Sequence, residues 1–399
     1  MTLTRGDFRR KNGGTPVNAK VINESLTRQL AVFTHGLPRH ANADSAPAFR
    51  KKIIRRYEDG MNALGLIDQQ KLGLITHHDI DAFAVDGVEI DIVLSGICGT
   101  DLAVLSGREE GKIGVVRGHE AVGVITRVGA GVKYLRPGMR VVVDPNEYCG
   151  TCEFCASGQT HLCNGGANAT LNIAGVNKHG TFAERFITRE RFVYPLPDDM
   201  SWETGVLIEP VACILNNIDQ AAIQAGERVL LLGSGPMSLV AQLLLRAMGV
   251  QTLATDLNPH RIAFGRSLGL EVIHPDDLEA RMQQGHVDAA IDTVGNQLGT
   301  AARYIRRGGK IVLFGFNGNY QYPLPVKHFL VNAISIISAG EYNQHFPRAL
   351  RMAKMLPELG RLVTHRYGLE AYAAAFDGLL NDPSVPTIKG VFTPNPQYL

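Results

Sequence analysis

The chain has 399 residues, of which 45% are hydrophobic and 20% are charged. At roughly 100 to 200 residues per domain, this length predicts two or three domains, and the composition excludes a disordered, collagen-like or low-complexity chain. The formal net charge of +2 does not support a general nucleic-acid binder, which would carry a strong basic excess. Six cysteines are too few for a disulfide-dense secreted scaffold, so their positions matter more than their number.

Residues 1–70 differ from the rest of the chain, since they contain 12 lysines and arginines but only 6 acidic residues. A transit peptide is poor in acidic residues and rich in serine, so this composition argues against one, and no secretory signal pattern is present. Apolar residues at helical spacing predict an amphipathic helix with a basic face, capped by Ser45 and stopped at Gly65. We expect this partly helical extension to pack on the main body or on a partner subunit, and the alternative is binding to a membrane surface or a polyanion. The apolar positions are Phe49, Ile53, Ile54, Tyr57 and Met61.

The remaining chain divides by its sequence pattern into a β-rich part and a part in which predicted strands and helices alternate. Short runs rich in Val, Ile, Gly and Pro over residues 71–212 predict a mostly antiparallel β domain, to which we also assign residues 345–399 with a last strand near Lys389–Phe392. Strands and helices alternate over residues 213–344, and this alternation predicts a doubly wound parallel sheet covered on both faces. The longest uncharged stretch, Val229–Leu245, contains glycine and proline, so it favours a strand, a turn and a helix over a membrane span.

Four of the six cysteines form a short cluster with the spacing C-x2-C-x2-C-x7-C. Four thiolates can close a tetrahedral shell around zinc and leave no open position, which is typical of a structural site. A disulfide interpretation and a chance grouping of buried cysteines are the weaker alternatives. A zinc ribbon or finger would use two separated pairs, so the spacing argues against a nucleic-acid module. The four residues are Cys149, Cys152, Cys155 and Cys163.

A second candidate metal site lies upstream, where Cys98 follows a predicted strand and His119 opens the next one. A thiolate and an imidazole are the mixed donor set of catalytic zinc sites, in which one position stays open. A third donor is needed. Glu209 is a candidate because a carboxylate in a hydrophobic run is costly unless it is paired or metal-bound, and Glu120 competes for the same role. Cys213 is interpreted as a small buried hydrophobe.

A glycine-rich turn follows the strand predicted at residues 229–232 and opens a helix. Its glycines let the backbone approach a pyrophosphate, and the helix N-terminus supplies unpaired N–H groups, although an ordinary strand-to-helix turn is the alternative. Asp256 ends the next strand, where a carboxylate would bind the ribose 2′-hydroxyl and favour NAD over NADP. The predicted cofactor-binding residues are Gly233, Ser234, Gly235, Pro236, Met237, Asp256 and Arg261.

Together these motifs resemble the zinc-dependent medium-chain alcohol and polyol dehydrogenases over roughly residues 71–399. The resemblance implies a Rossmann domain beside a GroES-like β domain, two zinc ions per chain and NAD. It also implies that Cys98 and His119 bind the catalytic zinc and that Thr100 begins the proton relay. Glu209 matches the sorbitol and threonine dehydrogenase branch, where this glutamate binds zinc directly or through water, and Glu120 can exchange with it.

The sequence departs from that family pattern in two places. Ala103 occupies the position where many members have the histidine that ends the proton relay, and the stretch from Lys71 to Cys98 is too short for the usual hairpin. A non-catalytic nucleotide-binding or scaffold protein is therefore one alternative, and a ketone or sugar reductase of the same family is another. Phe182, Phe316 and Tyr342 are either cleft-lining or core residues.

We expect a cytoplasmic homodimer or homotetramer that acts on a small-molecule alcohol or ketone, with no nucleic-acid or membrane partner. The candidate substrates are secondary alcohols: polyols, sugars, cyclitols or amino alcohols. The apolar run from Val331 to Ala339 predicts either a core strand or an edge strand that pairs with a second chain, and the family resemblance favours the edge.

Overall fold

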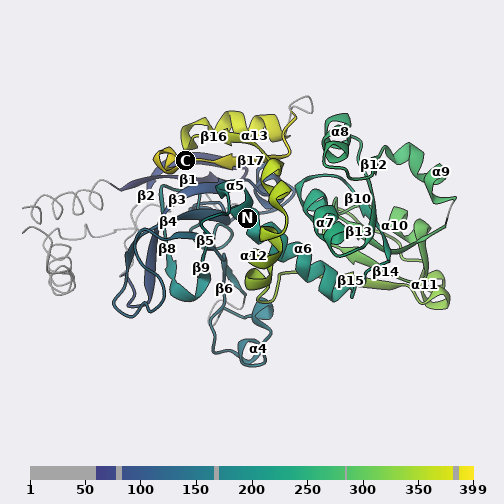
Figure 1. Cartoon of the computed structure of the whole chain (residues 1–399), viewed down its shortest axis with the longest axis horizontal. Coiled ribbons are helices and arrows are strands. Elements are labelled where there is room, and N and C mark those ends of the chain that lie inside the picture. The colour runs from purple at the N-terminus through teal and green to yellow at the C-terminus, as the bar shows by residue number, and fades with distance from the viewer. Residues whose placement is uncertain (1–59, 78–82, 166–169, 284, 381–385) are drawn as a thin grey trace, which may run out of the picture. The chain divides into compact units, whose positions relative to one another are not determined.

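Two large β-sheets organise the chain in the computed structural model, which describes residues 60–77, 83–165, 170–283, 285–380 and 386–399. One sheet has seven strands and the other six, and helices pack around them (Figure 1). This arrangement confirms the predicted α/β fold with one parallel and one mainly antiparallel sheet. Most of the predicted N-terminal helix lies outside the described residues.

The seven-stranded sheet has the order β16-β17-β3-β4-β5-β9, with β8 also paired to β3. Strand β3 is central, and all ten of its residues are buried. All neighbouring strands are antiparallel except β16 and β17. Strand β17, the last of the chain, pairs with β3 and so joins the sheet that contains the first candidate ligands. The strands are β3 (Gly87–Gly96), β4 (Glu120–Val128), β5 (Arg140–Val143), β8 (Arg185–Arg189), β9 (Val193–Pro195), β16 (Val363–Tyr367) and β17 (Lys389–Phe392).

A hairpin precedes this sheet and corrects the sequence analysis. Strand β1 (Met61–Asp68) pairs with β2 (Lys71–His77) in antiparallel register, so the end of the expected helix is a strand and the assignment of residues up to 70 to a helical extension was wrong for this part. Gly65, expected to stop a helix, instead leaves room for the Ile75 side chain on the facing strand. Residues 61–77 also provide the hairpin that the sequence analysis judged to be missing.

The six-stranded sheet is parallel throughout, with the order β12-β11-β10-β13-β14-β15. Helical crossovers connect its strands because parallel neighbours cannot be joined by tight turns. The strand predicted over the apolar run 331–339 is shorter in the structure. The first residues of this run belong to α11, which ends where Ala333 adopts a left-handed conformation, and only Ser335–Ser338 form a strand. The strands are β10 (Arg228–Leu232), β11 (Gln251–Thr255), β12 (Val272–Ile273), β13 (Val287–Asp292), β14 (Ile305–Leu313) and β15 (Ser335–Ser338). The helices are α7 (Pro236–Ala247), α8 (Pro259–Ser267), α9 (Leu278–Met282), α10 (Leu298–Tyr304) and α11 (Val326–Asn332).

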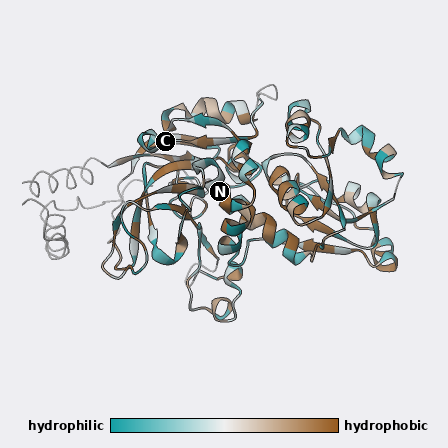
Figure 2. Ribbon diagram, in the orientation of Figure 1, coloured by the Kyte–Doolittle hydropathy of each residue, from teal (hydrophilic) through white to brown (hydrophobic). Residues whose placement is uncertain are grey.

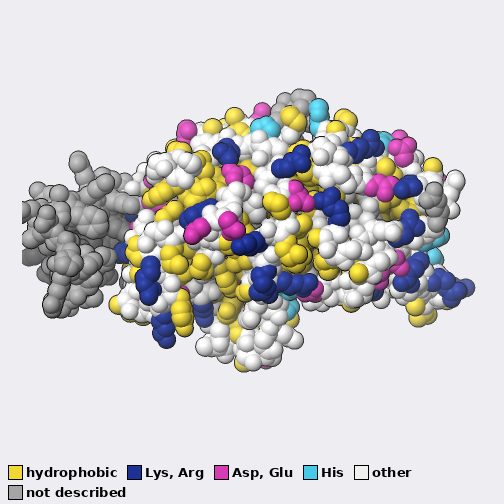
Figure 3. All heavy atoms as spheres, in the orientation of Figure 1, with side chains coloured by type: hydrophobic (Ala, Val, Ile, Leu, Met, Phe, Trp, Pro, Cys, Tyr) yellow, Lys and Arg dark blue, Asp and Glu magenta, His cyan; other side chains and the backbone are white. Residues whose placement is uncertain are grey.

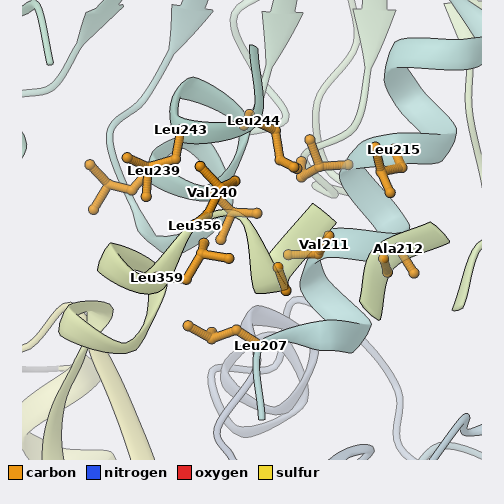
Figure 4. Close-up of a cluster of buried hydrophobic side chains, with 14 of the residues drawn as sticks. Leu207, Val211, Ala212, Leu215, Leu239, Val240, Leu243, Leu244, Leu356 and Leu359 are labelled. Atoms are coloured by element: carbon orange, nitrogen blue, oxygen red, sulfur yellow. The ribbon is translucent and has the colours of Figure 1, made fainter. Parts of the chain in front are cut away.

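Helix α6 (Ile208–Gln220) carries much of the largest hydrophobic core, which includes residues of both sheets. Figure 2 shows hydrophobic residues along α6 and α7, and the close-up in Figure 4 shows leucine and valine side chains of these helices meeting Leu356 and Leu359. Because ten of its thirteen residues are buried, the position of α6 is determined by packing. The remaining helices and strands are α3 (Gly99–Leu105), α4 (Glu153–Ala156), α5 (Trp202–Gly205), α12 (Phe346–Lys354), α13 (Tyr372–Leu380), β6 (Asn146–Glu147) and β7 (Asn172–Ile173).

Within the described chain, no helix has the length and apolar character needed to cross a bilayer. The uncharged stretch 229–245 is strand β10, a turn and most of α7, as predicted. In Figure 3, basic and acidic side chains lie interspersed on the visible face.

Replacing Gly118 with alanine should destabilise the fold next to the ligand segment. Gly118 has a φ of +91°, and a Cβ atom there would overlap the ring and backbone of Phe182. We expect a loss of about 3 kcal/mol or more in the free energy of unfolding, measured by urea denaturation. Gly138→Ala is the matched control, because its φ of +89° is similar but nothing lies within 4 Å of the added Cβ, so it should lose only about 1 kcal/mol. Equal losses in the two variants would contradict this account.

Candidate metal and nucleotide site

The pairing of β3 with β4 brings the first candidate ligands together. Gly96, the last residue of β3, lies opposite Glu120, the first residue of β4. Cys98 follows β3 at the start of α3, and His119 immediately precedes β4. As a result, Cys98, His119 and Glu120 each place a ligand atom within 4.8 Å of the others.

These donors fit a zinc ion. His119 is buried, and its Nδ1 atom has no hydrogen-bond partner within the described part of the chain, so a buried polar atom is free to bind a ligand. Burial disfavours the imidazolium, but the neighbouring Cys98 thiolate and the Asp101 and Glu209 carboxylates outweigh it and raise the pKa of His119 to about 10. A metal must therefore displace a proton from this site, and a thiolate, an imidazole and a carboxylate form a donor set that zinc prefers.

Glu209 is not within the 4.8 Å set, although its negative charge helps to raise the pKa of His119. It is buried in the first turn of α6, and burial raises the pKa of its carboxyl group to about 8. Its Oε1 accepts a hydrogen bond from Cys213 Sγ at 3.3 Å. Cys213 is half-buried and packs against the largest hydrophobic core, as the sequence suggested, but its thiol also donates this hydrogen bond.

Sequence reasoning missed Lys389, which pairs with Glu120. The Lys389 Nζ atom lies 2.7 Å from Oε1 and 2.5 Å from Oε2 of Glu120, although 269 residues separate the two in sequence. The lysine is 3% exposed and the glutamate 0%. Gly96 makes room for the pair, because a Cβ atom there would overlap the Glu120 carboxylate. The usable signal was a lysine at the start of an apolar terminal strand, because a buried lysine is costly unless it is paired.

A second buried ion pair holds the two ligand segments. Arg117 Nη2 lies 3.1 Å from Asp101 Oδ1, and both side chains are almost completely buried. Asp101 Oδ2 also accepts a hydrogen bond from the backbone N–H of Cys98 at 3.1 Å, which caps α3. Since Arg117 is two residues before His119, this pair ties the Cys98 turn to the His119 segment.

The four-cysteine cluster forms a separate site around α4. The Sγ atoms of Cys149 and Cys155 are 4.0 Å apart, and those of Cys152 and Cys163 are 3.9 Å apart. These separations are too long for disulfides but close to the roughly 3.8 Å edge of a tetrahedron with Zn–S bonds of about 2.3 Å. Backbone N–H groups of Thr151 and Cys152 donate to Cys149 Sγ and lower the pKa of this thiol to about 5. Burial instead raises the pKa of the Cys155 thiol to about 12, so a metal would have to displace its proton, and the Sγ separations suit a closed zinc site.

The glycine-rich turn adopts the geometry expected for dinucleotide binding. Gly233 has a φ of +97°, and Gly235 caps α7, whose first residue is Pro236. Asp256 follows β11 and accepts hydrogen bonds from the backbone N–H groups of Ser234 at 2.7 Å and Asn258 at 2.8 Å. The turn is thus fastened to the end of the neighbouring strand.

Two of the remaining predicted cofactor residues, Arg261 and Met237, lie beside this turn. The Arg261 Nη1 atom is 3.8 Å from Asp256 Oδ2, and Met237 is half-buried at the start of α7. Among the candidate cleft residues, Phe182 is core, because it is fully buried against Phe392. Tyr342 is also buried, whereas Phe316 is 65% exposed.

Comparisons with known proteins agree with this architecture. Residues 85–198 match the alcohol dehydrogenase GroES-like domain, and residues 236–355 match the zinc-binding dehydrogenase model. The chain belongs to the zinc-dependent medium-chain alcohol and polyol dehydrogenases, oxidoreductases of secondary alcohols.

Particular relatives support this assignment. Sorbitol dehydrogenase of Bacillus subtilis strain 168 is 31% identical over 310 residues, covering 74% of this chain and 87% of that protein. L-threonine 3-dehydrogenase of Anaeromyxobacter sp. strain K is 30% identical over 329 residues, covering 76% and 92%. An alcohol dehydrogenase of Escherichia coli CFT073 solved with NADH has a TM-score of 0.76 at 25% identity, covering 84% of this chain and 99% of that one.

Removing Lys389 should strongly destabilise the protein, because it leaves Glu120 buried without a counter-charge. We expect Lys389→Met to lower the free energy of unfolding by about 3–5 kcal/mol in urea denaturation, and the double variant Glu120→Gln/Lys389→Met to recover most of it. Lys354→Met is the control, since Lys354 pairs with Asp199 on the exposed surface and should change stability by less than about 1 kcal/mol. A Lys389→Met protein as stable as this control would disprove the role assigned to the pair.

Proposed function

We propose that the chain is an NAD-dependent dehydrogenase of a secondary alcohol, with a polyol, sugar, cyclitol or amino alcohol as substrate. The observation that carries the proposal is the convergence of Cys98, His119 and Glu120, each of which places a ligand atom within 4.8 Å of the others. The sorbitol and L-threonine dehydrogenases among the relatives support the substrate class.

The site's own residues account for binding and proton movement. Zinc bound at these donors supplies a Lewis acid that lowers the pKa of the substrate hydroxyl, and NAD accepts the hydride. Thr100 Oγ1 lies 3.7 Å from Cys98 Sγ in the exposed first turn of α3, so it is placed to take the hydroxyl proton. Ala103 is buried and cannot relay it further, so Thr100 passes the proton directly to solvent.

The same site would serve a ketone or sugar reductase, which is the reverse reaction. A non-catalytic scaffold protein is disfavoured, because such a protein has no need to keep a thiolate, an imidazole and a carboxylate within 4.8 Å of one another. We place two zinc ions per chain, one at Cys98, His119 and a carboxylate from Glu120 or Glu209, and one at the four-cysteine cluster.

Metal analysis of two cysteine variants tests this assignment. We expect about two zinc ions per wild-type chain and about one in Cys98→Ser, because each site binds independently. Cys98→Ser should keep its fold by circular dichroism but lose alcohol oxidation by at least about a hundredfold, measured as NADH absorbance. Cys152→Ser is the reciprocal variant and should lose the other zinc ion. Full turnover by Cys98→Ser with one zinc ion per chain would refute the catalytic site.

Cofactor preference rests on Asp256. Its carboxylate at the end of β11 would bind the ribose hydroxyls of NAD and repel a 2′-phosphate. Asp256→Ala removes this charge and leaves Arg261 free to meet the phosphate, so we expect the ratio of kcat/KM for NADP over NAD to rise by about tenfold or more. The neighbouring variant Arg261→Ala should not raise that ratio. An unchanged ratio in Asp256→Ala would show that the ribose contact is assigned wrongly.

We also propose a homodimer or homotetramer in the cytoplasm. Strand β15 is an edge of the parallel sheet, and the adjoining helix α11 exposes Leu330 and Val331, so apolar surface lies beside unpaired strand groups. The cysteines of both metal sites form no disulfides, as is usual for proteins of a reducing compartment, and this supports the cytoplasm.

A further inference from the structure

A cavity of about 270 Å³ lies at the amino edge of the parallel sheet, away from the nucleotide turn. It is lined by Arg228, Gln251 and Val287, which are the first residues of β10, β11 and β13. The nucleotide turn follows the carboxyl end of β10, so the length of this strand, roughly 15 Å, separates the two edges. The residues that line the cavity include none of the predicted metal or cofactor residues, so it is a separate site.

The floor of this cavity is apolar and its rim is polar. The floor is formed by Val229, Leu253 and Val287, which are all buried. The volume holds several water molecules at roughly 30 Å³ each, but it is smaller than the pockets of roughly 300–1,000 Å³ that bind drug-sized ligands. It therefore suits a compact ligand with polar groups. The residues of the rim are Arg228, Gln251, Thr252, Glu271 and Arg281.

The two arginines of the rim come from different elements. Arg228 and Gln251 are register partners in parallel strands, so their side chains lie on the same face of the sheet. Leu230, two residues after Arg228, lies on this face in one core cluster with Leu278 of α9. Helix α9 therefore covers the face, and its Arg281 reaches the cavity from the side opposite the strands.

The charges around the cavity leave one arginine without a counter-charge. Glu271 is neutralised by Arg281, whose Nη2 and Nε atoms lie 2.6 and 2.8 Å from Oε1. Asp288 of β13 already uses both carboxylate oxygens, since Oδ1 accepts from Arg306 Nε at 2.5 Å and Oδ2 from the backbone N–H of Arg228 at 2.8 Å. In the described part of the chain, no carboxylate lies at ion-pairing distance from the Arg228 guanidinium, so its positive charge is open to the cavity.

We propose that this cavity binds a small oxyanion, the carboxylate or phosphate group of a compact metabolite, through Arg228 and Arg281. A guanidinium presents planar N–H groups that match pairs of carboxylate or phosphate oxygens. Apolar walls strengthen this attraction because they lower the local dielectric constant. Gln251 and Thr252 provide hydrogen-bonding groups for the rest of the ligand. The inference is independent of the dehydrogenase function, because none of the catalytic donors takes part in it.

Calorimetric titrations of the zinc-loaded full-length protein with inorganic phosphate and with succinate, at constant low ionic strength, test the proposal. The wild type should bind at least one of these probes, and the one that binds more tightly identifies the ligand as a phosphate or a carboxylate. Arg228→Gln should weaken this binding by about tenfold or more, because it removes the unpaired guanidinium. Glu271→Gln should strengthen it by about threefold or more, because Arg281 then loses the carboxylate that competes with the anion.

Two further arginine variants lose the same charge and serve as controls. Arg361→Gln changes an exposed residue of the short helix η5 (Pro357–Leu362), which does not line the cavity. Arg261→Gln changes the arginine beside the nucleotide turn, where an anion could also bind. Both variants should bind the probes as the wild type does.

Each outcome of these titrations decides for or against the site. Weaker binding in Arg228→Gln alone, with stronger binding in Glu271→Gln, supports it. The inference is overturned if the wild type binds neither probe at millimolar concentration, or if Arg228→Gln binds as tightly as the wild type. Equal weakening in Arg361→Gln would reveal a general charge effect, and weakening in Arg261→Gln would place the anion at the nucleotide turn, so either result also overturns it. If Arg228→Gln does not fold, Glu271→Gln decides alone, and unchanged binding in that variant overturns the inference.

Discussion

The buried ion pair between Lys389 and Glu120 is the constraint on which the metal site depends. A carboxylate in a fully buried strand would lose far more in hydration than it could recover from nearby neutral groups. Lys389 supplies the missing charge from β17, the last strand of the chain, so the ligand segment is complete only when the C-terminus has joined the sheet. This explains why the tail returns to the first sheet after the chain has built the second.

The same principle recurs at Asp101 and Arg117, which tie the turn of Cys98 to the segment of His119. Both pairs neutralise buried charge beside the candidate ligands, and Lys389 does so on Glu120, which is itself one of those ligands. The donors are thus held in position before a metal arrives, which lowers the cost of ordering them at binding.

Helix α6 carries a candidate metal ligand and also packs in the largest hydrophobic core. Its first turn carries Glu209, and Asn216 two turns later holds the segment of Glu341. Because leucine and valine side chains of α6 pack into a core shared by both sheets, these two polar residues occupy well-defined positions. A rigid apolar helix therefore fixes the position of Glu209 and of the segment that follows β15.

The sequence by itself determined the features whose chemistry is local. Four cysteines within fifteen residues indicate a metal site whatever the surrounding fold. A glycine-rich turn between a strand and a helix predicts a nucleotide-binding site, because the backbone of the turn itself contacts the phosphates. The alternation of strands and helices likewise predicted the parallel sheet. Only the tertiary structure showed that Met61 belongs to a hairpin. The apolar spacing of that segment is compatible with a helix or a strand, and its pairing with β2 is what makes it a strand. The grouping of Glu120 rather than Glu209 with Cys98 and His119 and the partnership of Lys389 also required the fold, since each depends on contacts between residues far apart in the chain.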